Sequence, residues 1–327
     1  MPARVRIFVT CRTCREPLFA ALSRIGEVIP SPFRATRTLT EDELVTSLRE
    51  VDVVVAGTDP FTRRVLAAGA SSRLKVLARF GIGLDNVDLE AATESRVVVT
   101  YAPKASSVSV AEFAVGLILA LLRRIPEADL AVKAGSWPMT SMQGREIDGK
   151  TVGVVGLGTI GRRVADTLTQ MGARILAYDP YLKDDPRLAS LKKLLTSSDV
   201  ITVHSALTSR NTHLIGEKEF TMMKRGAILV NTARGAILDE RALRSALEDG
   251  RIAGAALDVL EVEPPSGPHP LARFPNVILT PHVAGNTAEA TERTGEVVLE
   301  DIRRVLGGRA PLYPANPEVV TALGLKK

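Results

Sequence analysis

A glycine-rich turn near the middle of the chain constrains its fold more than any other feature. Residues 156–161, GLGTIG, follow a strand-like run, TVGVV (151–155), and open an amphipathic helical stretch. A second strand-like run, RILAY (174–178), ends at Asp179, close to the spacing of about 20 residues expected of a ribose-binding carboxylate. Strand, glycines, helix, strand and acid in this order are typical of a dinucleotide-binding βαβ unit.

The turn also predicts how a nucleotide is held. Glycines let the backbone turn sharply and approach a pyrophosphate, which rests on the N-terminus of the following helix. The residues expected to do this are Gly156, Gly158, Thr159, Ile160 and Gly161. Because the negative charge of Asp179 would repel a 2′-phosphate, NAD is favoured over NADP as the cofactor. A tight strand–helix turn without a ligand is the alternative, and it fits this context less well.

The 327 residues suffice for about two domains. Strand-like runs alternate with helical ones both before and after the turn; they lie at 5–10, 51–57, 75–80, 97–100, 199–205, 227–235, 253–260 and 276–282. Such alternation predicts parallel sheets covered by helices. Since the glycine turn comes only after an earlier βα region, we predict an α/β protein with two doubly wound parallel-sheet domains, one inserted into the other.

The charge and the apolar stretches of the chain indicate which kinds of partner it binds. The net charge of +5 is spread over separate arginine pairs, so nothing points to nucleic-acid binding, and a small anionic substrate is the simpler reading. The most apolar stretch, FAVGLILALL (113–122), is too short to cross a membrane. With no secretory signal and only two cysteines, we expect a cytoplasmic protein without a membrane partner.

The two cysteines, Cys11 and Cys14, form a C-x-x-C between a strand and a helical run. A redox pair could occupy this place, and the neighbouring Arg12 and Arg15 could lower a thiol pKa. A zinc site would need further ligands. From the sequence we favour an incidental loop pair.

Three side chains in the second half follow the ends of expected strands, where doubly wound sheets bind their ligands: Arg234, Glu263 and His282. An arginine fork suits the carboxylate of a 2-oxo acid. Histidine is the usual proton carrier near neutral pH, and a carboxylate beside it would orient the ring. Taken singly, the arginine could be a surface charge and the glutamate a turn residue.

The order GLGTIG, Asp179, NTARG, AALDVLEVEPP and TPHVAG resembles that of the D-isomer-specific 2-hydroxyacid dehydrogenases. The phosphoglycerate dehydrogenase branch is nearest, because ARFGIGLDNVDLEAAT (78–93) and SVAEFAVGLILALLRRIPEA are also similar to it. The resemblance covers about 53–304, and we expect the C-terminal regulatory domain of some members to be absent. It implies a Rossmann NAD-binding domain, 104–286, inserted into a flavodoxin-like substrate-binding domain, 1–103 with 287–327.

The resemblance also implies roles for individual residues. His282 would be the acid/base, Glu263 its partner, and Arg234 the group that binds the substrate carboxylate and carbonyl. Further cofactor contacts would come from His204, Thr232 and Asp258. The substrate would also meet Arg79, Phe80, Gly81, Ile82 and Gly83.

We therefore expect an NAD-dependent oxidoreductase that moves a hydride between NAD(H) and C2 of a D-2-hydroxy or 2-oxo acid, and a homodimer. Arg12, Arg15, Arg79 and Lys104 favour a doubly anionic substrate such as 3-phosphoglycerate. Hydroxypyruvate, glyoxylate or a phosphonate are alternatives, as is a non-catalytic NAD(H)-sensing protein similar to corepressors. We expect no metal, and we expect His213 and His269 to be solvated loop residues.

Overall fold

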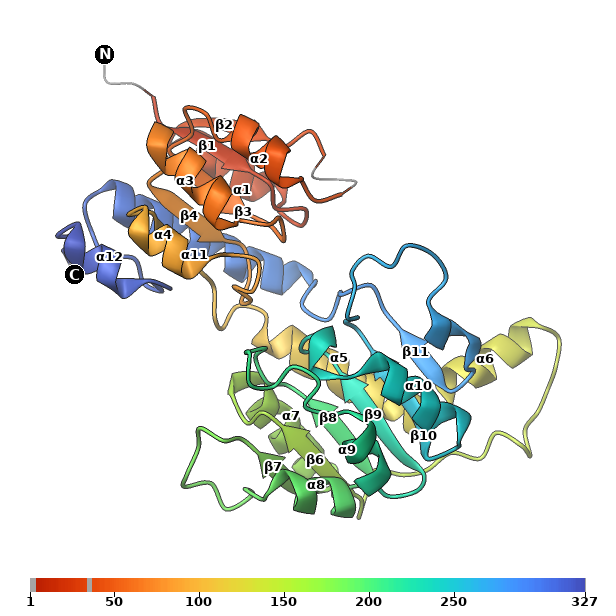
Figure 1. Cartoon of the computed structure of the whole chain (residues 1–327). Coiled ribbons are helices and arrows are strands. Elements are labelled where there is room, and N and C mark those ends of the chain that lie inside the picture. Colours follow the sequence, from red (N-terminus) through yellow and green to blue (C-terminus); the bar gives the residue numbers. More distant parts are fainter. Residues whose placement is uncertain (1–3, 34–36, 327) are drawn as a thin grey trace. The chain divides into compact units, whose positions relative to one another are not determined.

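The computed structural model describes residues 4–33 and 37–326, and the chain divides into two compact units. Unit 1 comprises Met1–Ser106 and Asn286–Lys327, and unit 2 comprises Ser107–Gly285. The domain bounds that the resemblance implies, 1–103 with 287–327 and 104–286, stay a prediction. In each unit a parallel sheet carries helices on both faces (Figure 1), which confirms the predicted fold class.

Unit 1 has a five-stranded parallel sheet in the order β2-β1-β3-β4-β5, which is the flavodoxin-like order. Its strands are β1 (Arg6–Val9), β2 (Glu27–Pro30), β3 (Val53–Ala56), β4 (Val76–Arg79) and β5 (Val98–Thr100). Apart from the edge strand β2, the strands are mostly apolar and buried along almost their whole length, as a sheet covered on both faces requires. Strand β2 was not predicted, since its sequence EVIP is half-exposed and carries a charge and a proline.

Side chains from successive strand residues pack on opposite faces of this sheet. Ile7 and Val9 lie in one hydrophobic cluster and Phe8 in the other. The first cluster is covered by α1 (Glu16–Ser23), α11 (Ala288–Leu306) and α12 (Pro317–Ala322). The second is covered by α2 (Glu41–Ser47), α3 (Arg63–Ser72) and α4 (Leu89–Glu94). Because α11 and α12 come from the C-terminal part of the chain, unit 2 is an insertion into unit 1.

Unit 2 has a six-stranded parallel sheet in the order β11-β10-β9-β8-β6-β7. Its strands are β6 (Thr151–Val155), β7 (Arg174–Tyr178), β8 (Val200–Val203), β9 (Ala227–Asn231), β10 (Ile252–Leu257) and β11 (Val277–Leu279). Beyond β7, a single parallel bridge joins Ala177 to Leu188. The sheet is therefore a Rossmann sheet whose usual third strand is reduced to one bridge.

Helices α5 (Ser107–Leu122) and α7 (Thr159–Gln170) cover one face of this sheet. The other face is covered by α8 (Leu191–Ser197), α9 (Glu217–Met222) and α10 (Glu240–Glu248). Helix α6 (Ile125–Lys133) has no buried residue, and the loop after it reaches away from the sheet of unit 2 (Figure 1). Over residues 4–33 and 37–326, no helix is long and apolar enough to cross a bilayer.

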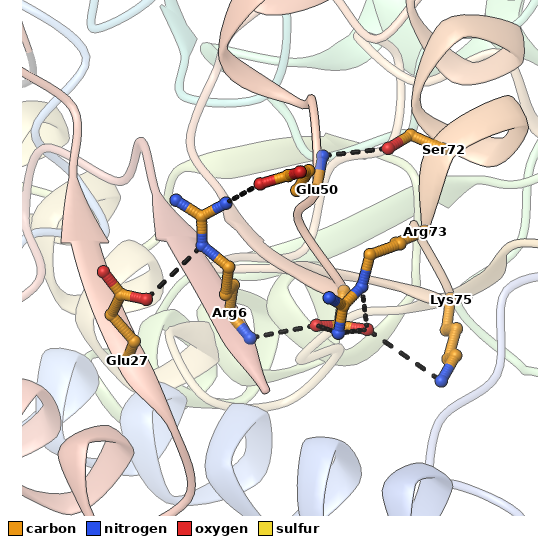
Figure 2. Close-up of polar contacts among 7 residues, drawn as sticks. Arg6, Glu27, Glu50, Ser72, Arg73 and Lys75 are labelled. Atoms are coloured by element: carbon orange, nitrogen blue, oxygen red, sulfur yellow. Dashed lines mark hydrogen bonds and ion pairs between the residues drawn. The ribbon is translucent and has the colours of Figure 1, made fainter. Parts of the chain in front are cut away.

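The amino ends of the strands in unit 1 are fixed by a charge cluster (Figure 2). The Asp52 side chain is only 3% exposed and accepts hydrogen bonds from the Arg6 amide at 3.0 Å and the Arg73 guanidinium at 2.8 Å. Arg6 in turn contacts Glu50 at 2.8 Å and Glu27 at 3.4 Å. The cluster joins β1, β2 and the segments before β3 and β4, at the edge opposite the carboxyl ends of the strands.

Candidate nucleotide-binding and catalytic site

The three glycines of the turn after β6 have three different environments. Gly156 has φ +93°, and a Cβ there would lie 2.5 Å from the Ser205 amide nitrogen. A Cβ on Gly161 would lie 2.0 Å from the Gly156 carbonyl oxygen. At Gly158, by contrast, a Cβ would meet nothing within 4 Å. The first and third glycines are thus required by the turn and by helix packing, while the second faces open space at the N-terminus of α7, where a pyrophosphate fits.

Asp179 follows β7 and is tied to this turn. Its Oδ2 accepts a hydrogen bond from the Leu157 amide at 2.9 Å, and its Oδ1 accepts one from the Tyr181 amide at 3.0 Å. The carboxylate therefore lies beside the glycines, as expected of a group that binds a ribose hydroxyl. The turn and Asp179 together fit an NAD molecule.

His204 follows β8 and is held between two threonine hydroxyls. Its Nε2 lies 2.8 Å from Thr202 Oγ1, and its Nδ1 lies 3.5 Å from Thr232 Oγ1. Burial lowers the pKa of His204 to about 3, so the imidazole is neutral at physiological pH. The predicted cofactor residues His204 and Thr232 thus contact each other across two strands.

Arg234 lies in the loop after β9, and the glycine that follows it brings two loops together. Asn231 stabilises this loop, because its Oδ1 accepts from the Ala233 amide at 2.9 Å and its Nδ2 donates to the Arg234 carbonyl at 2.8 Å. A Cβ on Gly235 would lie 2.0 Å from the Leu260 carbonyl carbon. Only glycine allows this approach, which places the loop after β9 against the loop after β10.

His282 and Glu263 form a direct pair. His282 Nδ1 lies 2.7 Å from Glu263 Oε2, and Glu263 Oε1 accepts from the Leu260 amide at 2.8 Å. Burial raises the pKa of Glu263, but the hydrogen bond and charge of His282, the Leu260 amide and the charge of Arg234 outweigh it, so the pKa lies below its ordinary value. The carboxylate stays ionised and fixes the imidazole, whose side chain is 44% exposed. This leaves Nε2 as the nitrogen free of that carboxylate.

Asp258 organises the loop that carries His282. It is buried, and its Oδ1 accepts from the Thr280 hydroxyl at 2.6 Å and the Val283 amide at 2.9 Å. Its Oδ2 accepts from the Ala284 amide at 2.8 Å, and its carbonyl accepts from the His282 amide at 2.8 Å. His282 adopts a left-handed conformation, φ +54°, within this loop. Asp258 therefore positions His282, and its contact with the nicotinamide stays a prediction.

A second set of histidine–glutamate contacts involves Glu240 and Glu261 and was missed from the sequence. Glu240 and Glu261 each accept a hydrogen bond from the other's amide, at 2.8 and 3.3 Å. His269 pairs with Glu240 at 3.1 Å, and His213 pairs with Glu261 at 2.7 Å. His213 is exposed, as expected of a solvated loop residue, but the same expectation is wrong for His269, whose side chain is 13% exposed. The sequence carries no signal of these pairs, because their members come from segments that are distant in the chain.

The expected substrate loop of unit 1 follows β4. Arg79 is buried, and its guanidinium donates to the Phe80 carbonyl at 2.5 Å. Gly81 has φ +149°, and a Cβ there would lie 2.9 Å from Arg79 Nη1. Ile82 and Gly83 continue the loop, whose Gly81 carbonyl accepts from the Ala102 amide at 2.9 Å. Arg79 thus stabilises the backbone of this loop through its contact with the Phe80 carbonyl. Among the described residues, no group of three His, Cys, Asp or Glu side chains is arranged to hold a metal ion.

Comparison with known proteins decides the family. Residues 115–284 match the model of the NAD-binding domain of D-isomer-specific 2-hydroxyacid dehydrogenases. The chain belongs to this family. A D-3-phosphoglycerate dehydrogenase of Methanocaldococcus jannaschii is 41% identical over 93% of the chain, but the match spans only 58% of that relative's length. A glyoxylate reductase of Thermofilum pendens is 38% identical over 99% of the chain and 98% of its own length.

A solved structure extends the comparison to the fold of the whole chain. The crystal structure of a Thermus thermophilus protein matches with a TM-score of 0.87 and 33% identity, over 95% of this chain and all of that one. Unit 2 is accordingly the NAD-binding domain of this family, and NAD is its cofactor. The predicted family and cofactor are thereby confirmed.

Proposed function

We propose that this dehydrogenase transfers a hydride between NAD(H) and C2 of a D-2-hydroxy or 2-oxo acid, with Arg234, Glu263 and His282 as its catalytic residues. The observation that carries the proposal is the 2.7 Å contact between His282 and Glu263. It leaves an oriented imidazole with one nitrogen available, on a loop adjacent to the NAD-binding sheet. NADH, when bound, supplies the hydride.

The side chains of the site transfer a proton to the substrate and stabilise its negative charge. In the direction of reduction, His282 Nε2 donates a proton to the carbonyl oxygen of the substrate. Glu263 holds the ring by Nδ1 and stabilises its cationic form. Arg234 stabilises the negative charge that develops on the carbonyl oxygen and binds the substrate carboxylate with its second N–H group. A role of the loop Phe80–Gly83 of unit 1 in binding substrate stays a prediction from the resemblance.

The substrate class is a separate part of the proposal. A doubly anionic 2-oxo acid, such as the oxidised form of 3-phosphoglycerate, is favoured by Arg12, Arg15 and Lys104, which are exposed in unit 1. Arg79 gives less support than expected, because it is buried beneath its own loop. The relatives include both a phosphoglycerate dehydrogenase and a full-length glyoxylate reductase match, so glyoxylate and hydroxypyruvate are the second candidates.

We further propose a homodimer, in which the α6 region forms part of the contact. Five apolar side chains of this region are between 50% and 80% exposed: Ile125, Leu130, Val132, Trp137 and Met139. An apolar surface of this kind is typical of an interaction site. A cytoplasmic location stays a prediction.

NADH oxidation with a panel of 2-oxo acids tests the activity. We expect His282→Ala to lower kcat about 10²- to 10⁴-fold while NADH still binds. Glu263→Gln should lower kcat with little change in KM, and Arg234→Ala should change both. Unchanged turnover in His282→Ala would refute the assignment. Tight NADH binding without oxidation by any 2-oxo acid would favour the NAD(H)-sensing alternative.

A comparison of substrates tests specificity. The oxidised form of 3-phosphoglycerate should show a higher kcat/KM than glyoxylate and hydroxypyruvate. Lys104→Ala should lower kcat/KM for the doubly charged substrate more than for glyoxylate. An equal effect of this variant on both substrates would contradict the doubly anionic assignment and leave the hydride transfer itself standing.

A further inference from the structure

The C-x-x-C of unit 1 takes no part in the reaction proposed above. Cys11 lies just past the end of β1, and Cys14 lies just before α1. Both side chains are buried, at 2% and 5% exposure, and both are thiols. The two residues between them, Arg12 and Thr13, are exposed. The two cysteines therefore lie next to exposed residues, at the carboxyl edge of the five-stranded sheet.

The two cysteines are in direct contact. The Cys14 amide donates a hydrogen bond to Cys11 Sγ at 3.1 Å, and the Thr13 hydroxyl lies 3.6 Å from the same sulfur. Burial raises the pKa of the Cys11 thiol, but hydrogen bonds from the Cys14 and Thr13 side chains and amides outweigh it, so the pKa lies below its ordinary value. A donor-rich pocket of this kind stabilises a thiolate. Cys11 is thus the more reactive sulfur, with a second thiol already beside it.

We propose that Cys11 and Cys14 form a reversible intramolecular disulfide, with hydrogen peroxide as the oxidant. The sequence favoured an incidental pair, because C-x-x-C alone does not show whether two side chains face each other. In the structure the amide and side chain of Cys14 contact Cys11, and this favours a disulfide-forming pair over an incidental one. The neighbouring Arg12 and Arg15 add positive charge in the chain segment around the pair.

Oxidation of the two thiols to the disulfide proceeds in two steps. The Cys11 thiolate attacks one peroxide oxygen, the O–O bond breaks, and Cys11 becomes a sulfenic acid as the departing hydroxide takes a proton and forms water. Cys14 Sγ then attacks the Cys11 sulfur, the S–O bond breaks, and the hydroxide leaves as a second water with the proton of Cys14. Two electrons pass from the sulfurs to peroxide. A dithiol reductant reverses the bond by thiol–disulfide exchange.

The place of the pair in the fold suggests what the disulfide would change. Cys11 and Cys14 belong to the same hydrophobic cluster as Phe80, the first residue of the proposed substrate loop. The Gly57 amide on the neighbouring strand end donates to the Thr10 hydroxyl at 2.9 Å, and a Cβ on Gly57 would lie 3.2 Å from Cys11 Cα. Closing the disulfide alters packing beneath that loop, so we expect KM for the 2-oxo acid to change and NADH affinity to stay constant. This consequence rests on the proposed function, whereas the disulfide does not.

Alkylation and mass spectrometry test the disulfide directly. The full-length protein is treated with hydrogen peroxide, quenched, denatured and alkylated with iodoacetamide. Because Cys11 and Cys14 are the only cysteines, the assignment is unambiguous. We expect the peptide that contains both to lose two hydrogens and resist alkylation, and dithiothreitol to restore two alkylation sites. The urea-denatured chain, oxidised in parallel, is the control for the strength of the treatment.

Two variants test the order of the steps. Cys14→Ser should accumulate a Cys11 sulfenic acid that dimedone traps, whereas Cys11→Ser should leave Cys14 reduced under the same conditions. Full alkylation of the folded wild-type chain, where the denatured control is oxidised, would overturn the proposal. So would a disulfide that links two chains on a non-reducing gel, or a Cys14 that reacts as fast without Cys11 as Cys11 does without Cys14.

Discussion

Replacing Gly161 by alanine tests whether the glycine turn is shaped by packing or by its ligand. A Cβ at this position would lie 2.0 Å from the Gly156 carbonyl oxygen, whereas ordinary contact begins near 3.4 Å. Both partners belong to backbone that cannot rotate away, so α7 and the end of β6 must separate by about 1.4 Å, the difference between these distances. The matched control is Gly158→Ala, because a Cβ there meets no atom within 4 Å.

The size of the effect follows from two opposing contributions. Overpacking a buried site costs roughly 1–3 kcal/mol, and a clash with backbone belongs at the upper end. Alanine returns about 1 kcal/mol of helix propensity within α7. The net loss is about 2 kcal/mol, which for a domain of this size lowers Tm by roughly 4–8 °C. For Gly158→Ala we expect almost no change in Tm, but at least about a tenfold loss of NADH affinity, or about 1.4 kcal/mol, because Gly158 is the glycine that we expect to face the pyrophosphate.

Scanning calorimetry without cofactor and fluorescence titration with NADH separate the two outcomes. Gly161→Ala should shift the unfolding transition of unit 2 before any ligand is added. If Gly158→Ala lowers Tm as much as Gly161→Ala does, or binds NADH like the wild type, then the assignment of the second glycine to the ligand and the third to packing is wrong.

Two further predictions concern stability. Burial lowers the pKa of His204 to about 3, so the imidazole stays neutral in the folded state. In the unfolded chain the same side chain takes up a proton below about pH 6.5. The free energy of unfolding therefore falls as pH drops from about 6.5 toward 3, by about 2 kcal/mol at pH 5. In urea titrations, His204→Gln should reduce the difference in unfolding free energy between pH 7 and pH 5 by about 2 kcal/mol. An unchanged difference would show that His204 is not the group responsible. Asp52→Asn should destabilise unit 1 by about 2 kcal/mol, less than for a fully buried pair because Arg73 is 35% exposed, whereas Glu50→Gln, with its side chain 74% exposed, should have almost no effect in the same titration. Equal losses of unfolding free energy in Asp52→Asn and Glu50→Gln would show that the burial of Asp52 does not strengthen its contacts.

Several features of the site follow from local sequence because their cause is local. The turn at Gly156 needs a positive φ, which glycine adopts without strain, and Gly158 and Gly161 stand at fixed places in a strand–helix junction. Strands of a two-sided parallel sheet are continuous apolar runs, and this made β6 and β8–β10 visible. The edge strand β2 lacks such a run, since half of it faces solvent, and it was missed.

Other features depend on how distant segments meet. The sequence named Glu263 and His282 as candidates, but their 2.7 Å contact exists because β10 and β11 pair in parallel register and the loop after each is held by Asp258. The pairing of His269 with Glu240 is likewise set by the sheet, and neither residue signals the other in the chain.

The amino-acid sequence by itself determined the two parallel sheets, the insertion of one in the other, the glycine turn and the residues that stand at the strand ends. These rest on backbone conformation and on the alternation of apolar and polar residues, which act over a few residues. Only the tertiary structure decided which side chains meet: that Arg79 folds beneath its own loop, that Glu261 pairs with His213, and that the Cys14 amide donates to Cys11 Sγ. Such contacts are fixed by strand order, register and close backbone approach, which no single segment encodes.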